Sequence, residues 1–312
     1  MIPLVAHFIW IGSSLPYTHL IALRSAARSG GFSQVILHHT HDFTEGEVWL
    51  ALKSEPKVVM RRLELEQRVR AVESRFGLLG RFQQLSQPAA LANVVRAIIL
   101  WEEGGVYLDL DTITIKSFAP LCQEASFFCG VERLVFPAAV RGSRSPFVHG
   151  QALFRTALRD GLRRLPSGWR WFKRVAGLYP VAANNAVMGA EAKHPFLEHL
   201  LANMAALSDV EWQRRFRLGT HLLQRSLGTY AGKDATVLLP EAFYPLGPEI
   251  SEHWFRSQRP LALSEMLDDS TLSVHWYASV RTANYTRDIT AESIRRDAGH
   301  QPYAALAEPF IE

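Results

Sequence analysis

Two aspartates close an apolar run in the middle of the chain, in the segment Gly104-Gly105-Val106-Tyr107-Leu108-Asp109-Leu110-Asp111. In an extended strand, Asp109 and Asp111 lie on one face, about 7 Å apart, because successive side chains point to opposite faces. Carboxylate oxygens are ligands that hard divalent cations such as Mg²⁺ and Mn²⁺ prefer. Such ions commonly neutralise a diphosphate that is transferred or displaced. The pair therefore predicts a metal and phosphate site.

A polar pair precedes the two acids on a segment with helical periodicity. Asn93 and Arg96 are three residues apart, so on a helix they share one face. Arg96 is surrounded by apolar residues and needs a partner, because a buried unpaired charge is very costly. Two interpretations stay open: Arg96 holds a phosphate or carboxylate of a ligand, or it forms a salt bridge to Asp109 or Asp111 with no ligand.

Histidines supply two further candidate metal sites. A neutral imidazole is a competent ligand for Mn²⁺, so His275 could complete a site begun by two aspartates, although an isolated histidine is often structural. The run His38-His39-Thr40-His41-Asp42 lacks the spacing of helical or finger-like metal ligands and follows a strand pattern. We therefore expect an ordinary loop there.

The elements that must position these residues begin with a β-α-β pattern. Residues 5–11 and 34–38 are apolar enough for short buried strands, and residues 17–29 have a helical pattern. This order predicts an α/β fold with a parallel, doubly wound sheet and a ligand crevice at its strand ends. A glycine pair should stop a helix over residues 88–103 before the strand that carries the two aspartates.

The remaining segments are weaker predictions. We expect residues 46–76 to be mostly helical, and helices at 195–207 and 211–227. Further short strands are expected at residues 126–131, 182–188, 237–240 and 273–276.

Composition indicates one globular unit of enzyme size. The chain has 312 residues, 48% of them hydrophobic, and no apolar run approaches the length that spans a membrane. The N-terminus lacks the pattern of a signal peptide, and Cys122 and Cys129 lie in apolar surroundings without metal-ligand spacing. Reduced core thiols and a cytoplasmic location are therefore expected.

Basic residues are concentrated between residues 155 and 174, where three aromatic residues lie among them and Asp160 is the one acid. Such a stretch is typical of a surface for anionic membrane lipid, a phosphorylated carrier or nucleic acid. Because charge runs usually only face water, the stretch is also typical of a solvated helix face followed by an aromatic turn that anchors in the core. No second motif supports nucleic acid.

Several blocks in order resemble the glycosyltransferases that carry the DXD sugar-binding domain, glycosyltransferase family 32. The resemblance lies in residues 5–16, in Ala89-Ala90-Leu91-Ala92-Asn93-Val94-Val95-Arg96 and in the segment from Gly104 to Asp111. It extends to Asn184-Asn185-Ala186-Val187-Met188-Gly189-Ala190, to His194-Pro195-Phe196 and to Val274-His275-Trp276-Tyr277-Ala278-Ser279. The combination of blocks is far more specific than an isolated DXD.

This resemblance implies a GT-A fold, a Rossmann-like and mostly parallel central sheet flanked by helices. One domain would span residues 1–312, with a nucleotide-sugar half over about 1–120. An acceptor half and a C-terminal loop for metal and diphosphate would follow over about 121–312.

The resemblance also implies roles for individual residues. Trp10 and Ile11 would contact the nucleotide, Trp10 by stacking on its base, and Tyr107 would lie near the nucleoside. Arg96 and Asn93 would bind the donor sugar, although relatives commonly have aspartate in place of Asn93.

Further residues would hold the phosphates and the metal. Asp109 would contact the ribose and the ion, and Asp111 would ligate Mn²⁺ or Mg²⁺ between the two phosphates. Asn185 would bind the donor sugar or the acceptor, and His275 would complete the metal site. Trp276 and Ser279 would close over the diphosphate and exclude water.

The function expected on these grounds is that of a retaining, metal-dependent glycosyltransferase. It would move a hexose from a nucleotide sugar, UDP being favoured over GDP, to a saccharide or lipid-linked glycan in polysaccharide or glycolipid synthesis. Two alternatives stay open. One is a haloacid-dehalogenase-like phosphatase that uses Asp109 and Asp111, with Asp268 and Asp269 as later metal acids. The other is a binding module with a transferase fold and no turnover.

Overall fold

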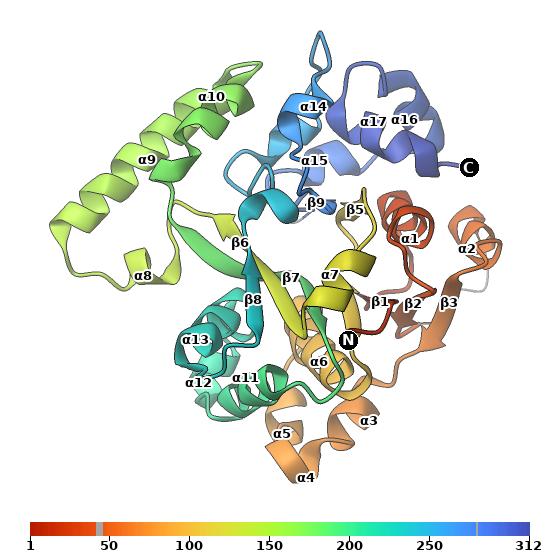
Figure 1. Cartoon of the computed structure of the whole chain (residues 1–312), viewed down its shortest axis with the longest axis vertical. Coiled ribbons are helices and arrows are strands. Elements are labelled where there is room, and N and C mark those ends of the chain that lie inside the picture. Colours follow the sequence, from red (N-terminus) through yellow and green to blue (C-terminus); the bar gives the residue numbers. More distant parts are fainter. Residues whose placement is uncertain (42–45, 279) are drawn as a thin grey trace. The chain divides into compact units, whose positions relative to one another are not determined.

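The computed structural model describes residues 1–41, 46–278 and 280–312 (Figure 1). The chain forms two compact units. The first unit comprises Met1–Leu110, Lys116–Gly130 and Ala183–Leu238. The second unit comprises Asp111–Ile115, Val131–Ala182 and Leu239–Glu312. The chain thus passes from the first unit to the second between the two predicted metal ligands, Asp109 and Asp111.

A seven-stranded sheet, nearly all of it in the first unit, has the order β3-β2-β1-β4-β7-β6-β8. Its strands are β1 (Val5–Trp10), β2 (Gln34–His39), β3 (Val58–Arg62), β4 (Gly105–Leu108), β6 (Phe127–Arg133), β7 (Val181–Ala190) and β8 (Ala235–Leu238). Strand β1 pairs in parallel with β2 and β4, β2 with β3, and β6 with β8, whereas β4 and β7 are antiparallel. The predicted α/β fold with a mostly parallel sheet is confirmed.

Helices flank this sheet (Figure 1). Those of the first unit are α1 (Tyr17–Ser29), α2 (Glu47–Lys53), α3 (Leu65–Arg70), α4 (Glu73–Phe76), α5 (Leu79–Phe82), α6 (Pro88–Glu103), α7 (Ala119–Glu124), α11 (Pro195–Ala205), α12 (Asp209–Trp212) and α13 (Leu222–Thr229). The π-helical turn η2 (Arg217–His221) precedes α13. Helix α6 carries much of the core, because Val94, Ile98 and Trp101 are all buried in the main hydrophobic cluster.

The glycine pair ends α6 for a steric reason. Gly104 has φ +69° and Gly105 has φ +99°, conformations that residues with a Cβ rarely adopt. A Cβ on Gly105 would stand 2.6 Å from the carbonyl oxygen of Val5 and 2.9 Å from Nε2 of His7. The close approach of β4 to β1 therefore requires glycine at this position.

The second unit contains a two-stranded antiparallel sheet and several helices. Strand β5 (Thr112–Thr114) pairs with β9 (Ser273–His275), and Thr112 is opposite His275. The helices are α8 (Ala138–Arg141), α9 (Pro146–Arg164), α10 (Gly168–Val175), α14 (Leu263–Met266), α15 (Ala283–Thr286), α16 (Ala291–Asp297) and α17 (Pro302–Ala307). Short 3₁₀ turns are η1 (Ala176–Leu178), η3 (Pro240–Ala242), η4 (Ser251–Trp254) and η5 (Glu308–Phe310). In the described ranges, no helix is both long and apolar enough to cross a membrane.

Three predictions of secondary structure are wrong in detail. Residues 58–62 form the edge strand β3 instead of continuing a helix, because pairing with β2 outweighs the local helical pattern. The strand with the acids ends at Leu108, and a separate strand starts at Thr112, so Asp109 and Asp111 lie between strands. The predicted helix over 211–227 is interrupted between α12 and α13.

Two buried cysteines and a buried histidine pair lie away from the acids. Cys122 and Cys129 are free and buried, as expected, and burial raises the pKa of each thiol to about 12.

Nδ1 of His7 lies 3.0 Å from Nε2 of His38, and Nε2 of His7 lies 3.0 Å from the Gly104 carbonyl oxygen. The candidate metal run therefore contributes His38 to a structural contact, while Asp42 lies outside the described residues.

The His7 and His38 pair makes stability depend on pH. Burial lowers the pKa of His7 from 6.5 to about 4, and burial with His7 beside it lowers that of His38 well below 6.5. The unfolded chain therefore takes up protons near pH 6.5, where the folded chain does not, so stability falls as pH decreases from about 6.5 toward 4.

We expect the free energy of unfolding to drop by about 2 kcal/mol for His7 alone between about pH 7 and pH 5, measured by urea denaturation. His7→Gln should flatten this dependence, and His149→Gln, at an exposed position of α9, should leave it unchanged. Equal pH dependence in the wild type and the His7→Gln variant would contradict this assignment.

Candidate active site

Arg96 is the centre of a polar cluster in the first unit. Its guanidinium is buried, and Nη2 lies 3.1 Å from Oδ1 of Asp109. Nη1 donates to the carbonyl oxygen of Asn185 over 2.7 Å, and the guanidinium stands over the ring of Tyr107 at 4.3 Å from its centroid. The salt bridge predicted as one of the two interpretations of Arg96 is therefore present, and it orients the guanidinium beside Asp109.

Asp109 is fixed from several sides. The hydroxyl of Tyr107 donates to its Oδ1 over 2.6 Å, and its own N–H donates to the carbonyl oxygen of Ala186 over 2.8 Å. The carboxylate is only partly buried. A negative charge held by a phenol and a guanidinium, yet in reach of solvent, is suited to bind a hydroxyl or a cation.

An amide pair lies next to Arg96. Nδ2 of Asn185 donates to Oδ1 of Asn93 over 2.8 Å, which links α6 to β7. The turn η2 packs directly against this pair, because a Cβ on Gly219 would stand 3.0 Å from Nδ2 of Asn93 and 3.3 Å from Nδ2 of Asn185. Gly219 is a site residue that sequence reasoning missed; the irregular segment between α12 and α13 is the signal that could have found it.

Trp10 is the last residue of β1. Because β1 and β4 are parallel neighbours, Trp10 lies at the end of the sheet where β4 also ends. Its ring lies 4.7 Å from that of His19 in an edge-to-face arrangement, and among the residues described its indole Nε1 has no hydrogen-bond partner. Gly12 borders the indole closely, since a Cβ there would be 3.1 Å from it. Ile11 is partly buried against the main hydrophobic cluster.

The second unit holds Asp111 and His275 as a pair. Nε2 of His275 lies 2.9 Å from Oδ1 of Asp111, and the backbone N–H of Ala278 donates to Oδ2 over 2.7 Å. The pairing of β5 with β9 brings the two residues together, since the N–H of Trp276 donates to the Asp111 carbonyl oxygen over 3.0 Å. Both carboxylate oxygens of Asp111 are thus oriented by one short segment.

Tyr277 shapes that segment, and sequence reasoning assigned it no role. Its φ is +61°, a value uncommon for a residue with a Cβ, and the turn aims the next N–H at Asp111. Its hydroxyl donates to Oε2 of Glu132 over 2.8 Å, and burial together with this carboxylate raises the pKa of Tyr277 well above its usual value. The Tyr277 ring lies 4.1 Å from the imidazole of His275, so it also supports the imidazole.

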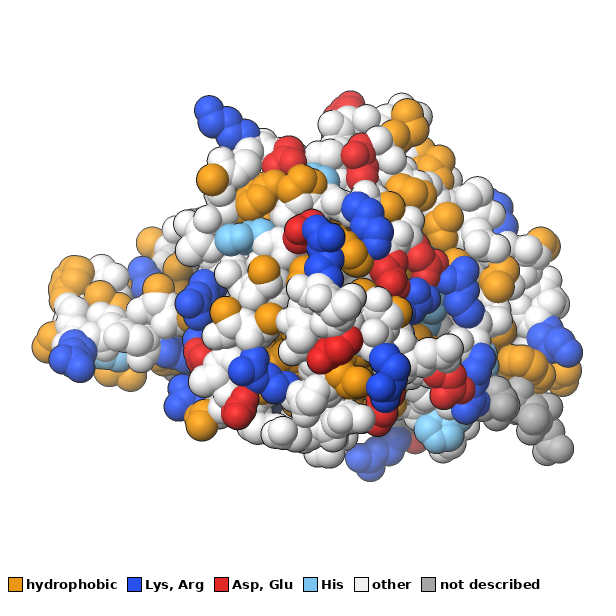
Figure 2. Space-filling view, turned by 90° about the horizontal axis from the view of Figure 1, so that it is seen from below, with side chains coloured by type: hydrophobic (Ala, Val, Ile, Leu, Met, Phe, Trp, Pro, Cys, Tyr) orange, Lys and Arg blue, Asp and Glu red, His pale blue; other side chains and the backbone are white. Residues whose placement is uncertain are grey.

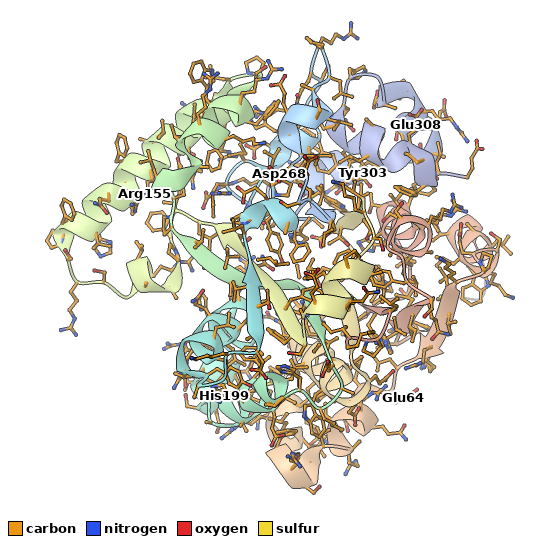
Figure 3. The ribbon with its side chains drawn as sticks, in the orientation of Figure 1. Glu64, Arg155, His199, Asp268, Tyr303 and Glu308 are labelled. Carbon is orange, nitrogen blue, oxygen red and sulfur yellow. The ribbon has the colours of Figure 1, made fainter. Side chains whose placement is uncertain are left out.

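Trp276 is buried in an aromatic cluster of the second unit. Its ring lies 5.7 Å from Phe255 and 5.6 Å from Tyr303, which Figure 3 labels on α17. Ser279, the other residue expected to close over the diphosphate, lies outside the described residues.

Residues 35–128 match the family described as a glycosyltransferase sugar-binding region containing a DXD motif. The matched segment includes Asn93, Arg96 and Tyr107, and its DXD corresponds to Asp109-Leu110-Asp111. A search of curated protein sequences finds no match.

Solved structures with a similar fold include three glycosyltransferases. Mouse xyloside xylosyltransferase 1 has 16% identity and a TM-score of 0.48, over 86% of this chain and 96% of that chain. The galactosyltransferase LgtC with donor and acceptor sugar analogues has 11% identity and a TM-score of 0.44, over 98% and 95%. PaToxG glycosyltransferase has 15% identity and a TM-score of 0.45, over 72% and 69%. At these identities the likeness concerns the fold alone.

The matched segment assigns the class: the chain contains a DXD sugar-binding region of glycosyltransferases. The protein is an enzyme of the glycosyltransferase type, with its DXD at the point where Asp109 follows β4 and Asp111 precedes β5.

Gly219 provides a test of the amide pair. Gly219→Ala forces Asn93 or Asn185 to move by a few tenths of an ångström, so we expect glycosyl transfer to fall about tenfold or more while the melting temperature changes little. Gly228→Ala is the matched control, because in α13 a Cβ at Gly228 meets no atom within 4 Å. Equal turnover in the two variants would show that the packing of η2 does not position the pair.

Proposed function

We propose that this protein is a retaining, metal-dependent GT-A glycosyltransferase that moves a hexose from a nucleotide sugar, with UDP favoured over GDP. The observation that carries the proposal is Arg96, which belongs to the matched sugar-binding region and is buried between Asp109, Tyr107 and the carbonyl oxygen of Asn185. A buried guanidinium beside a partly exposed carboxylate combines a positive charge for a phosphate with an acceptor for hydroxyl groups.

The first unit would hold most of the donor. Trp10 would stack on the base, with Ile11 beside it and Tyr107 near the nucleoside. Asp109 would bind the ribose, and Arg96 with Asn93 would bind the donor sugar. The bond from Asn185 to Asn93 supports this role, since it directs the amide groups of both side chains to one place.

A divalent ion, Mn²⁺ or Mg²⁺, would be held by Asp109, Asp111 and His275. Within the second unit, Nε2 of His275 lies 2.9 Å from Oδ1 of Asp111, which supports a role for this pair as ligands. Two carboxylates and an imidazole are a donor set that suits Mn²⁺. When bound, such an ion stabilises the negative charge that grows on a departing diphosphate.

The side chains themselves would act by positioning and by electrostatics. Departure of the diphosphate builds negative charge on the phosphate, which the Arg96 guanidinium would stabilise, and positive charge at the anomeric carbon, which amide oxygens would stabilise. Fixed dipoles and charges do this without reorganising at the moment of reaction. The Asn93 and Asn185 amides and the Arg96 guanidinium are fixed in this way by the contacts already described. No carboxylate nucleophile is required if the acceptor enters on the face that the diphosphate leaves.

The acceptor is proposed to be a saccharide or a lipid-linked glycan, in polysaccharide or glycolipid synthesis. Three further expectations stay predictions. They are the cytoplasmic location, the absence of nucleic acid among the partners, and the division into a nucleotide-sugar half and an acceptor half. Trp276 would help to exclude water, and its burial beside Phe255 supports a rigid wall at that position.

The phosphatase alternative is less well supported. It requires Asp109 as a nucleophile, whereas Oδ1 of Asp109 accepts from Tyr107 and pairs with Arg96. Asp268, expected to hold a metal, instead accepts from the backbone N–H and the hydroxyl of Ser270 within a turn. These contacts favour the transferase.

Asp111→Ala tests the proposed metal site. With Mn²⁺ and a panel of nucleotide sugars, we expect the wild type to release UDP or GDP, and the variant to lose this release by about a hundredfold or more. Asp288→Ala, at an exposed position, should retain it. Unchanged release and unchanged Mn²⁺ dependence in Asp111→Ala would refute the proposal, and turnover of a phosphate monoester instead would support the phosphatase.

Arg96→Lys tests the guanidinium. Lysine keeps the charge but loses the fork that contacts Asp109 and the Asn185 carbonyl together, so we expect kcat/KM for the donor to fall about tenfold to a hundredfold. Arg287→Lys, at an exposed position, is the control, and circular dichroism melting checks the fold. Wild-type kcat/KM in Arg96→Lys would exclude a role for the forked geometry.

A further inference from the structure

Helix α9 in the second unit exposes large apolar side chains along one face. Phe147 is 74% exposed, Leu153 66%, Phe154 62% and Leu165 47%. These four residues, called the apolar stripe below, recur at helical spacing on the 19-residue helix and at the residue that follows it. Monomeric soluble proteins rarely expose contiguous apolar surface of this kind without a function.

As far as Gly161, the positions between the large residues add no hydrogen-bonding side chain to this face. Gly150, Ala157 and Gly161 are exposed and lie along the same side of the helix by their spacing. Figure 2 shows hydrophobic side chains exposed at its left end, over α8 and the start of α9, with Lys and Arg side chains among them. By the same spacing the exposed Arg164 lies on this side in the last turn, so the helix face is apolar from Phe147 to Gly161 and has a basic residue at its C-terminal end.

Positive charge surrounds the stripe. Residues 138–181 contain nine Lys and Arg residues and a single acid, Asp160. Within the second unit, three of the arginines are engaged by acids from elsewhere in the unit: Arg159 by Glu249, Arg163 by Glu252 and Arg170 by Glu265.

Other basic side chains have no such acid. Arg155, labelled on α9 in Figure 3, donates to the carbonyl oxygen of Leu178 over 2.6 Å. Arg141, Arg144, Arg164 and Arg174 are exposed, and none has an acidic partner among the residues described. The exposed arginines without an acidic partner thus lie before the 155–174 stretch (Arg141 and Arg144), at its middle (Arg164) and at its end (Arg174).

We propose that the apolar stripe of α9 docks on the surface of an anionic lipid bilayer, with Arg141, Arg144, Arg164 and Arg174 contacting the lipid phosphates. An amphipathic helix with Phe and Leu on one face and Arg at its borders lies in the plane of a membrane interface without crossing it. Anionic headgroups supply the negative charge that the acids of this segment do not. Trp171, 53% exposed beside Arg174, adds an aromatic group of the kind that favours the headgroup level.

The charges argue against a second copy of the chain on this face. A symmetric dimer through α9 places the same excess of arginines on both sides of the interface, so each copy repels the other. A bilayer containing anionic lipid instead attracts every one of these residues.

Co-sedimentation with vesicles tests the docking. We expect the full chain to bind vesicles of phosphatidylglycerol mixed with phosphatidylcholine, and to bind vesicles of phosphatidylcholine alone much more weakly. Phe147→Ser with Phe154→Ser should reduce the partition coefficient about a hundredfold, since each buried aromatic side chain accounts for about tenfold. Leu50→Ser with Val210→Ser is the matched control, because these residues are 66% and 65% exposed on α2 and α12.

A second pair of variants separates charge from apolar contact. Arg144→Gln with Arg164→Gln should weaken binding and its salt dependence, whereas Arg214→Gln with Arg287→Gln changes the net charge equally and should not. Vesicle binding that is absent, or unaffected by the stripe variants, overturns the proposal. So does a dimer in lipid-free solution that Phe154→Ser converts to monomer in sedimentation velocity. Neither readout depends on transferase activity.

Discussion

The buried guanidinium of Arg96 is the constraint on which the polar cluster of the first unit depends. An arginine in the core of α6 is stable only if its charge and its hydrogen bonds are matched. Three groups provide this match: the ring of Tyr107 on β4, the carboxylate of Asp109 just after β4, and the carbonyl oxygen of Asn185 on β7. Helix α6 and strands β4 and β7 are therefore held in one arrangement by the Arg96 guanidinium, whose positive charge could also serve a ligand.

A second constraint acts on Asp111. The antiparallel pairing of β5 with β9 and the left-handed turn at Tyr277 direct His275 and the N–H of Ala278 at its two carboxylate oxygens. Both aspartates of the DXD are thus oriented by neighbours before any ion or diphosphate binds. Such preorganisation is what a transferase needs, because charge that is already in place costs no reorganisation during the reaction.

Much of the site could be predicted because its residues lie in segments with strong local signals. The β-α-β start, the helix before the glycine pair and the apolar run into Asp109 have clear periodicity and clear ends, and the match to the sugar-binding region includes the last two of these segments. Strand β3 was missed because none of its residues is fully buried and its last two are arginines, and only pairing with β2 makes them a strand. Gly219 and Tyr277 were missed because Gly219 packs against Asn93 and Tyr277 bonds to Glu132, both far away in the chain.

The sequence by itself determined the residue types and their local elements: an acid pair after an apolar run, an arginine on a helix, a late histidine. Local periodicity and glycine conformations suffice for that, since they depend on neighbours in the chain. Only the tertiary structure decided that Asp109 pairs with Arg96 and Asp111 with His275. It also separated the basic residues between 155 and 174 into ion-paired and exposed groups. These choices depend on strand order and on which distant side chains meet, which no local pattern encodes.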